Sequence, residues 1–157
     1  MPSENEWYKA AYYDPNNGWP GVGGYWLFGT GSNTPPTAVA SGTTPGTTVW
    51  GGQDGPAAVD QSGGLSPYGT QGQTGNVYQW METDFADPTN SSDGNRVFRG
   101  GYWQTTTVAQ RSDFRLQISP SSFAGYTGFR VASVPEPASA ALLGLGTLLL
   151  TTRRRSA

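Results

Sequence analysis

The sequence predicts an α+β domain that is rich in coil, with one clear helix and small twisted antiparallel sheets, followed by a short C-terminal transmembrane helix. Among 157 residues, 23 are Gly and 12 are Pro, a composition typical of many turns and little regular structure. Only 3 Leu, 1 Ile, 9 Val and 6 Phe precede Pro135, which is few for a folded chain. The same stretch, however, holds all 6 Trp, 8 Tyr and 6 Phe, and these side chains bury enough area to form a core.

Residues 3–13 are predicted to form the helix. Ser3 is a preferred N-cap residue and Glu6 follows three positions later, which together indicate a capping box. Trp7 begins a narrow apolar stripe along one face of this helix. The turn residues at 14–18 (DPNNG) are expected to end it.

Residues 14–75 contain so much Gly, Pro, Ser, Thr and Asn that they indicate one long coil. Because a structureless loop of this length is unusual in a compact domain, its aromatic residues are expected to attach it to the core: Trp19, Tyr25, Trp26, Phe28 and Trp50. Alternating or β-prone residues predict short strands at 76–81, 96–103 and 128–133. Two consecutive glycines, Gly100 and Gly101, predict a bulge or a close approach of two backbone segments.

The composition excludes several classes of chemistry. The sequence contains no Cys and no His, so it has no disulfide, no thiolate nucleophile, no Cys/His zinc site and no Ser-His-Asp triad. The net charge is -2 and the isoelectric point is about 4.9. Because binding to phosphates needs a basic surface, no nucleic-acid partner is expected.

Residues 134–157 differ in character from the rest of the chain. They begin with Pro135, Glu136 and Pro137, continue with an apolar run at 138–150, and end with Arg153, Arg154 and Arg155. The run is shorter than the roughly 20 residues of a membrane-spanning helix. Two threonines extend it to a marginal length, and the three arginines would stop it at the cytoplasmic face. The alternative is an amphipathic helix that packs on the domain, although the run has no polar face.

The order of these three parts resembles the PEP-CTERM sorting signal. The resemblance implies a protein exported by a Gram-negative bacterium, whose tail lies in the membrane until an exosortase-type protease recognises the motif and removes it. The product would reside in the cell envelope, at the surface or in the extracellular matrix. Export also needs a signal peptide, and residues 1–4 show neither a basic nor an apolar region, so a mis-assigned start or a fragment is expected.

Four segments at 2–11, 75–80, 96–103 and 128–132 match, in order, the patterns "LPSEAEWEYAA", "GNVWEW", "RVLRGGSW" and "GFRVA". Together they resemble the sulfatase-modifying factor, or formylglycine-generating enzyme, family. The resemblance implies a fold related to C-type lectins and a partial domain at 1–133 whose N-terminal half is missing, with the sorting signal at 134–157. Without that half, Trp7, Tyr78 and Phe129 would lack packing partners. It also implies structural roles for Trp7, Trp80, Arg99, Gly100, Gly101, Gly128, Phe129 and Arg130.

The resemblance further implies metal cofactors, each of which needs particular ligand residues in the sequence. The family's oxidases hold copper with a cysteine pair, which would fall near residues 108–115, and related sulfoxide synthases hold iron with histidines. Neither residue type is present, so both activities are excluded for this chain. Calcium is the remaining candidate, held by Asn76, Val77 and Gln79 with backbone carbonyls. Gln79 replaces the family's glutamate, which weakens such a site. The alternative is that Asn76 caps a turn and Gln79 bonds to backbone.

Three further groups of residues have two interpretations each. The acidic cluster of Glu82, Asp84, Asp87 and Asp93 indicates either a solvated turn region or, less well, a glycosidase-type carboxylate pair. The arginines in motif positions either brace loops or anchor a ligand: Arg99, Arg111, Arg115 and Arg130. Four aromatic residues either belong to the core or form a carbohydrate platform: Trp19, Trp26, Trp50 and Tyr102.

The functional hypothesis is a surface-sorted, non-catalytic member of this family that acts as a binding or matrix component of the envelope. Its expected partners are the processing protease, the membrane and a carbohydrate or envelope-protein ligand, and no cofactor beyond calcium is considered. One alternative is an enzyme whose catalytic residues lie in the missing N-terminal part. A second is a truncated gene remnant.

Overall fold

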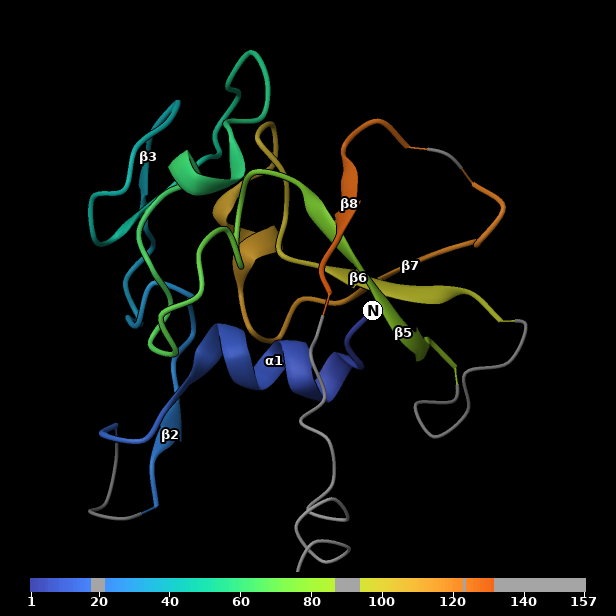
Figure 1. The fold of residues 1–157 in the computed structure, drawn as a ribbon, viewed down its shortest axis with the longest axis horizontal. Coiled ribbons are helices and arrows are strands. Elements are labelled where there is room, and N and C mark those ends of the chain that lie inside the picture. Colours follow the sequence, from blue (N-terminus) through green and yellow to red (C-terminus); the bar gives the residue numbers. More distant parts are fainter. Residues whose placement is uncertain (18–21, 87–93, 123, 132–157) are drawn as a thin grey trace, which may run out of the picture.

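The computed structural model describes residues 1–17, 22–86, 94–122 and 124–131. The expectations for Trp19, Asp87, Asp93 and the sorting region, including residues 135–137, the apolar run and residues 153–155, fall outside these ranges. In the described ranges, none of the helices has both the length and the apolar character that crossing a bilayer requires. Figure 1 shows helix α1 (Glu4–Tyr12) crossing below a small sheet, with the coil-rich segment to the left.

The predicted helix is present, with the predicted capping box. The backbone N–H of Glu6 donates to Ser3 Oγ at 3.3 Å, and the backbone N–H of Ser3 donates to Glu6 Oε2 at 2.8 Å. These two bonds satisfy donors that the first turn would otherwise leave unpaired. Tyr13 is the C-cap, so the helix ends within one residue of the predicted position.

The main sheet has four strands in the order β7-β6-β5-β8: Leu116–Ile118, Arg96–Arg99, Tyr78–Asp84 and Thr127–Phe129. Strand β6 pairs antiparallel with β5 and with β7, whereas β8 pairs parallel with β5. The sheet is therefore mixed, not antiparallel throughout. Sequence patterns identified three of its strands, although β5 lies two to three residues later than predicted and β8 ends at Phe129. They missed β7, whose three residues form a strand by pairing with β6.

Strand β6 ends at Arg99, earlier than predicted, because the next residue cannot continue it. Gly100 has φ +99°, and a Cβ there would lie 2.8 Å from the backbone oxygen of Gln73. Only glycine tolerates both conditions. The predicted close approach of two backbone segments at the paired glycines is thereby confirmed.

The long coil contains short elements that the sequence did not reveal. Strands β1 (Tyr13–Asp14) and β2 (Gly24–Tyr25) pair antiparallel, and β3 (Thr37–Ala38) and β4 (Thr47–Thr48) pair parallel. The coil also contains a 3-10 turn, η1 (Val59–Gln61). A second 3-10 turn, η2 (Thr107–Gln110), lies outside the coil, between β6 and β7. Phe28 is buried, as expected for a residue that attaches the coil to the core. Tyr25 is 51% exposed, so that expectation was wrong for this residue.

The core is largely aromatic, as the composition predicted, and it lies on both faces of the sheet. One cluster joins α1 to the sheet through Trp7, Ala11, Tyr12, Met81 and Val97, and the other contains Tyr78, Phe98 and Ala109. Neighbouring residues of a strand face opposite sides, which places Val97 and Phe98 in different clusters. Trp7 and Tyr78 are buried and do not lack partners, whereas Phe129 is 69% exposed on β8. Burial raises the pKa of Tyr78 to about 12.

We expect Ser3→Ala to lower the free energy of unfolding by about 1 kcal/mol, because it removes the capping hydrogen bond to Glu6. The pKa of Glu6 is lowered by its hydrogen bonds from Ser3. A lowered pKa means that the capping contribution is present above the ordinary pKa of Glu and is lost as the pH falls through the folded-state value.

Urea denaturation of the wild type and the variant at neutral and acidic pH measures both effects. The matched control is Ser121→Ala, whose side chain bonds to Ser119 in an exposed loop away from any helix. An equal loss of stability in the two variants would contradict the capping role.

Candidate functional site

The four sequence motifs meet at one buried amide, that of Gln79. Its Oε1 accepts hydrogen bonds from Trp7 Nε1 at 2.7 Å and from Arg130 Nε at 2.5 Å. Its Nε2 donates to the backbone oxygens of Gly72 at 2.6 Å and Gln73 at 3.2 Å. The third motif reaches the same point, since a Cβ on Gly100 would lie 3.5 Å from this Nε2. Of the residues assigned structural roles, Trp7, Gly100 and Arg130 thus lie around Gln79.

The residues considered for calcium are engaged in protein contacts. Asn76 has φ +64°, and its Oδ1 accepts from the backbone N–H of Ala57 at 2.7 Å while its Nδ2 donates to the Ala57 oxygen at 3.1 Å. A cation at Gln79 Oε1 would have to displace the positively charged guanidinium of Arg130. Within the described ranges, no three acidic side chains come together. This donor set does not fit Ca²⁺, which prefers several carboxylate oxygens.

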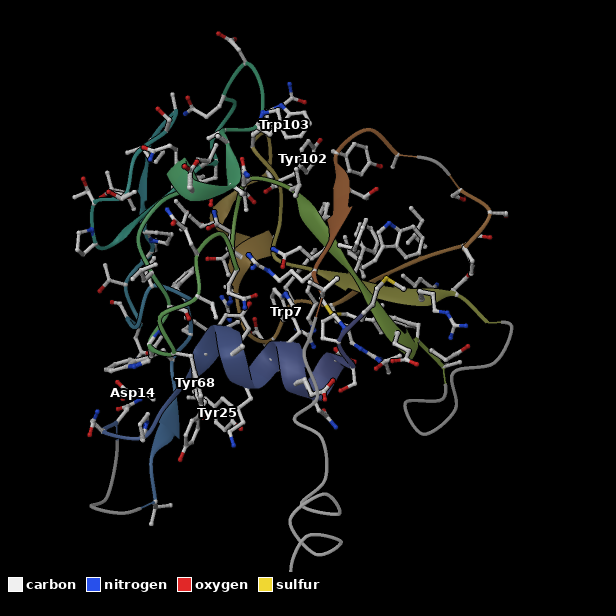
Figure 2. The ribbon with its side chains drawn as sticks, viewed as in Figure 1. Trp7, Asp14, Tyr25, Tyr68, Tyr102 and Trp103 are labelled. Atoms are coloured by element: carbon white, nitrogen blue, oxygen red, sulfur yellow. The ribbon has the colours of Figure 1, made fainter. Side chains whose placement is uncertain are left out.

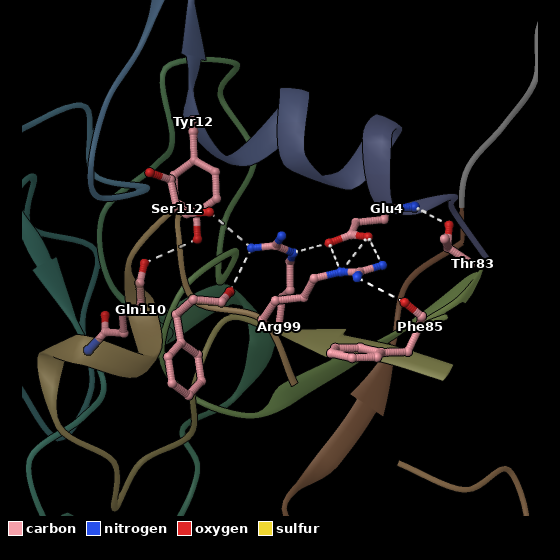
Figure 3. Close-up of polar contacts among 9 residues, drawn as sticks. Glu4, Tyr12, Thr83, Phe85, Arg99, Gln110 and Ser112 are labelled. Carbon is pink, nitrogen blue, oxygen red and sulfur yellow. Dashed lines mark hydrogen bonds and ion pairs between the residues drawn. The ribbon is translucent and has the colours of Figure 1, made fainter. Parts of the chain in front are cut away.

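A second centre is the carboxylate of Glu4, which lies between two arginines (Figure 3). Arg99 Nε donates to Glu4 Oε1 at 2.6 Å, and Arg115 Nη2 lies 2.8 Å from Oε2. Arg99 Nη1 also donates to the backbone oxygens of Ser112 and Phe114 at 3.0 and 2.6 Å. The two arginines therefore brace loops, as one of the sequence interpretations proposed.

The Glu4 centre borders a hollow of about 340 Å³ that Asn5 and Tyr8 also line. The guanidinium of Arg99 lies 5.3 Å from the ring centre of Tyr8, so a cation–π contact covers part of it. The sequence pattern could have pointed to Glu4. It precedes Trp7 by three positions and Ala11 by seven, which places a carboxylate within the buried stripe of the helix.

The remaining charged residues are dispersed. Asp84 is buried at the end of β5, where its Oδ1 accepts from the backbone N–H of Ala86, so it does not belong to a solvated turn. Glu82 is exposed on the same strand. Arg111 and Asp113 form an exposed ion pair that lowers the pKa of Asp113.

Gln110, next to Arg111 in the chain, is fully buried, and its backbone oxygen accepts a hydrogen bond from Tyr12 Oη at 3.1 Å.

An exposed row of rings, here called the tyrosine surface, comprises Tyr8, Tyr13, Tyr25 and Tyr68. Tyr25 lies at its centre, 5.3 Å from Tyr8 and 5.2 Å from Tyr13, and Tyr13 lies 6.0 Å from Tyr68. Tyr25 and Tyr68 are 51% and 48% exposed, and Figure 2 shows both beside α1. The row extends into the core, because the ring centre of Tyr8 also lies 5.0 Å from that of the buried Tyr12.

Strand pairing and charges position the tyrosine surface. Tyr13 and Tyr25 are directly opposite partners of β1 and β2. Tyr13 Oη donates to the backbone oxygen of Val22 at 3.1 Å, and Lys9 Nζ lies 5.4 Å from the Tyr13 ring centre. No sequence pattern indicates this surface, because Tyr12 and Tyr13 are adjacent in the chain. The end of the helix directs the first inward, whereas the second is only half-buried.

The carbohydrate-platform candidates within the described ranges do not belong to the tyrosine surface: Trp26, Trp50 and Tyr102. Trp26 and Trp50 are half-buried and donate through Nε1 to Asp14 Oδ2 and to the Pro36 oxygen, both at 3.2 Å. Tyr102 belongs to a second aromatic group, stacked 4.7 Å from Tyr126. Figure 2 places Tyr102 and Trp103 at the opposite end of the molecule from Tyr25 and Tyr68.

Comparison with known proteins identifies two regions of the chain. Residues 1–134 match the model of the sulfatase-modifying factor enzyme 1-like domain, and residues 133–155 match the PEP-CTERM protein-sorting motif. A hercynine oxygenase from Mycolicibacterium smegmatis is 29% identical over 151 residues, which cover 84% of this chain and 32% of that protein. The chain therefore spans about a third of this curated relative.

Two solved structures share the fold. The Treponema denticola variable protein 1 superposes with a TM-score of 0.56 at 21% identity, covering 82% of this chain and 45% of that one. PvdO from Pseudomonas aeruginosa superposes with a TM-score of 0.53 at 19% identity, covering 82% and 50%. These neighbours confirm the predicted coil-rich fold of one helix and small sheets.

We expect Glu4→Gln to destabilise the protein by about 3–5 kcal/mol, because it leaves two arginine charges without their buried carboxylate. Asp113→Asn is the matched control, since it makes the same chemical change in the exposed pair with Arg111, and it should alter stability little. Chemical denaturation of both variants checks the difference. Equal effects would contradict a central role for the Glu4 centre.

Proposed function

The chain belongs to the sulfatase-modifying factor enzyme 1-like family, and from this premise we propose that it is a non-catalytic binding protein of the bacterial envelope. The PEP-CTERM motif at residues 133–155 directs it to the envelope or cell surface and implies processing by an exosortase. We further propose a Gram-negative source and a tail that is inserted in the membrane before cleavage, with residues 153–155 on the cytoplasmic side.

The tyrosine surface is the observation that carries the binding role. Tyrosine supplies a large apolar ring and a polar hydroxyl with few rotatable bonds, so it contributes contact area at a small entropic cost. Tyr25 and Tyr68 each leave about half of their surface free although both touch other rings. Lys9 and Asp14 lie beside them and provide charges of both signs at the edge of the patch.

The geometry of the rings favours a protein ligand over a carbohydrate. The ring planes of Tyr8 and Tyr25 are inclined by 44°, and those of Tyr13 and Tyr25 by 59°. The successive pyranose rings of an extended glycan stack through their C–H faces best on aromatic rings that are nearly coplanar, whereas rings inclined to one another fit the side chains of a protein surface. The proposed partner is therefore a protein of the envelope or matrix.

The residue inventory supports a non-catalytic role. The family resemblance implies cysteines for copper and histidines for iron, and the sequence has neither. The two arginines at Glu4, Arg99 and Arg115, are occupied in bracing contacts. The charged residues at these positions therefore connect loops to the helix and the sheet.

We expect the double substitution Tyr25→Ala and Tyr68→Ala to weaken binding of the processed protein to envelope material by about tenfold or more, since buried interface tyrosines are frequent hot spots. Quantitative co-sedimentation with envelopes from cells that lack the protein measures this. The matched control is Tyr126→Ala, a partly exposed tyrosine of the second aromatic group.

Two treatments of the envelopes identify the partner. Protease treatment should abolish binding and periodate oxidation of glycans should not, while the reverse result would assign the surface to carbohydrate. Undiminished binding of the double variant would reject the tyrosine surface as the binding site.

Intact-mass spectrometry of the protein recovered from the cell surface should give a C-terminus near Pro135. The exosortase that the motif implies would remove the residues that follow it. Recovery of peptides that contain Arg155 in the surface-exposed protein would argue against processing. Replacing residues 135–137 with alanines should keep those peptides in the cell-associated fraction.

A further inference from the structure

A hollow of about 170 Å³ lies between α1 and the residues that follow β8, apart from the tyrosine surface. Its apolar wall is made by Pro2, Trp7, Ala10 and Val131. A cavity of roughly 150 Å³ can admit a molecule the size of benzene, so this space suits a ligand of about eight non-hydrogen atoms. Four polar residues line it, and one of them, Thr70, already bonds through its hydroxyl to Ser66. The other three set the chemistry of what could bind: Glu6, Gln73 and Arg130.

Gln73 contributes an acceptor that lacks a partner. The residue is 5% exposed, and its Oε1 is buried without a hydrogen bond in the described structure. The oxygen is closed to solvent, so a ligand in the hollow reaches it only when the Gln73 side chain turns toward that space. An unpaired buried acceptor costs free energy that a ligand N–H or O–H group would then recover.

Arg130 contributes a cation without a counter-ion. It is half-buried, and in the described part of the chain it donates hydrogen bonds to the neutral oxygens of Gln79 and Gln71. No ion pair joins it to an acidic residue of the described ranges. Desolvation lowers the pKa of Arg130, which reflects the same lack of compensation. A ligand carboxylate would supply the missing negative charge.

Glu6 balances the charge of the lining. Its carboxylate accepts from Ser3 at the start of α1 and forms no ion pair with Arg130. The wall thus carries one negative and one positive side chain at separate points, with an apolar surface between. A simple anion would meet Glu6 and a simple cation would meet Arg130, so a ligand that carries both charges fits best.

We propose that this hollow binds a small aliphatic α-amino acid. Its carboxylate pairs with Arg130, its ammonium group donates to Gln73 Oε1 on the side of Glu6, and its side chain packs on Trp7 and Ala10. The site is independent of the proposed binding of a protein by the tyrosine surface, because the four tyrosines do not line it.

The probe is L-valine, titrated into the full chain while the indole N–H signal of Trp7 is followed by NMR. We expect a saturable shift with a dissociation constant in the millimolar range. Isobutylamine lacks the carboxylate and 3-methylbutanoate lacks the ammonium group, and each should bind at least about tenfold more weakly. No shift up to a valine concentration of about 50 mM, or equal binding of all three probes, would overturn the proposal.

Two variants separate binding from folding. Gln73→Leu removes the unpaired acceptor, so it should weaken valine binding by about tenfold or more while the melting temperature is kept or raised. Ala10→Leu fills the hollow and should abolish binding in a folded protein. Asn5→Ala, in the hollow beside Glu4, is the control and should leave valine binding unchanged. Wild-type affinity in the folded Gln73→Leu and Ala10→Leu variants would reject the site.

Discussion

The buried carboxylate of Glu4 is the contact on which the arrangement of this domain most depends. It is the first residue of the helix, yet it pairs with one arginine from β6 and one from the segment before β7. Its backbone N–H donates to Thr83 Oγ1 at 2.8 Å, which ties the same point to β5. A charge removed from water is tolerated only when it is fully paired, so one carboxylate fixes the positions of β6 and of the segment before β7 relative to α1.

Polar contacts of this kind compensate for the shortage of aliphatic residues. The interior contains thirteen buried polar or charged residues of the described chain, against ten buried hydrophobic ones. Most such groups have a partner, and many of these bonds join segments far apart in sequence, as between Thr48 and Gln110 or Ser66 and Ala10. The long coil is thus held by directional bonds, which specify one conformation more narrowly than apolar contact alone.

Local signals predicted the local features and missed those that arise from tertiary pairing. The capping box, the helix and the glycine pair each depend on neighbouring residues, and all three were predictable. The strand β7 and the parallel pairing of β8 depend on partners distant in the chain, which no short pattern records. The candidate site likewise combines features that local sequence predicts with features that only the tertiary fold reveals. Gln79 was singled out from its motif, but its partners Trp7 and Arg130 became visible only in the fold. The tyrosine surface and the unpaired oxygen of Gln73 gave no sequence signal.

The parallel position of β8 determines the order in which the protein can be completed. Strand β8 is the last element of the domain, and it pairs with β5 about fifty residues earlier in the chain. The sorting motif begins at residue 133, directly after it. During synthesis the sheet therefore stays one strand short until the sorting signal itself is about to emerge. Completion of the sheet and the sorting signal thus depend on neighbouring parts of the chain, because only three residues separate β8 from the start of the motif.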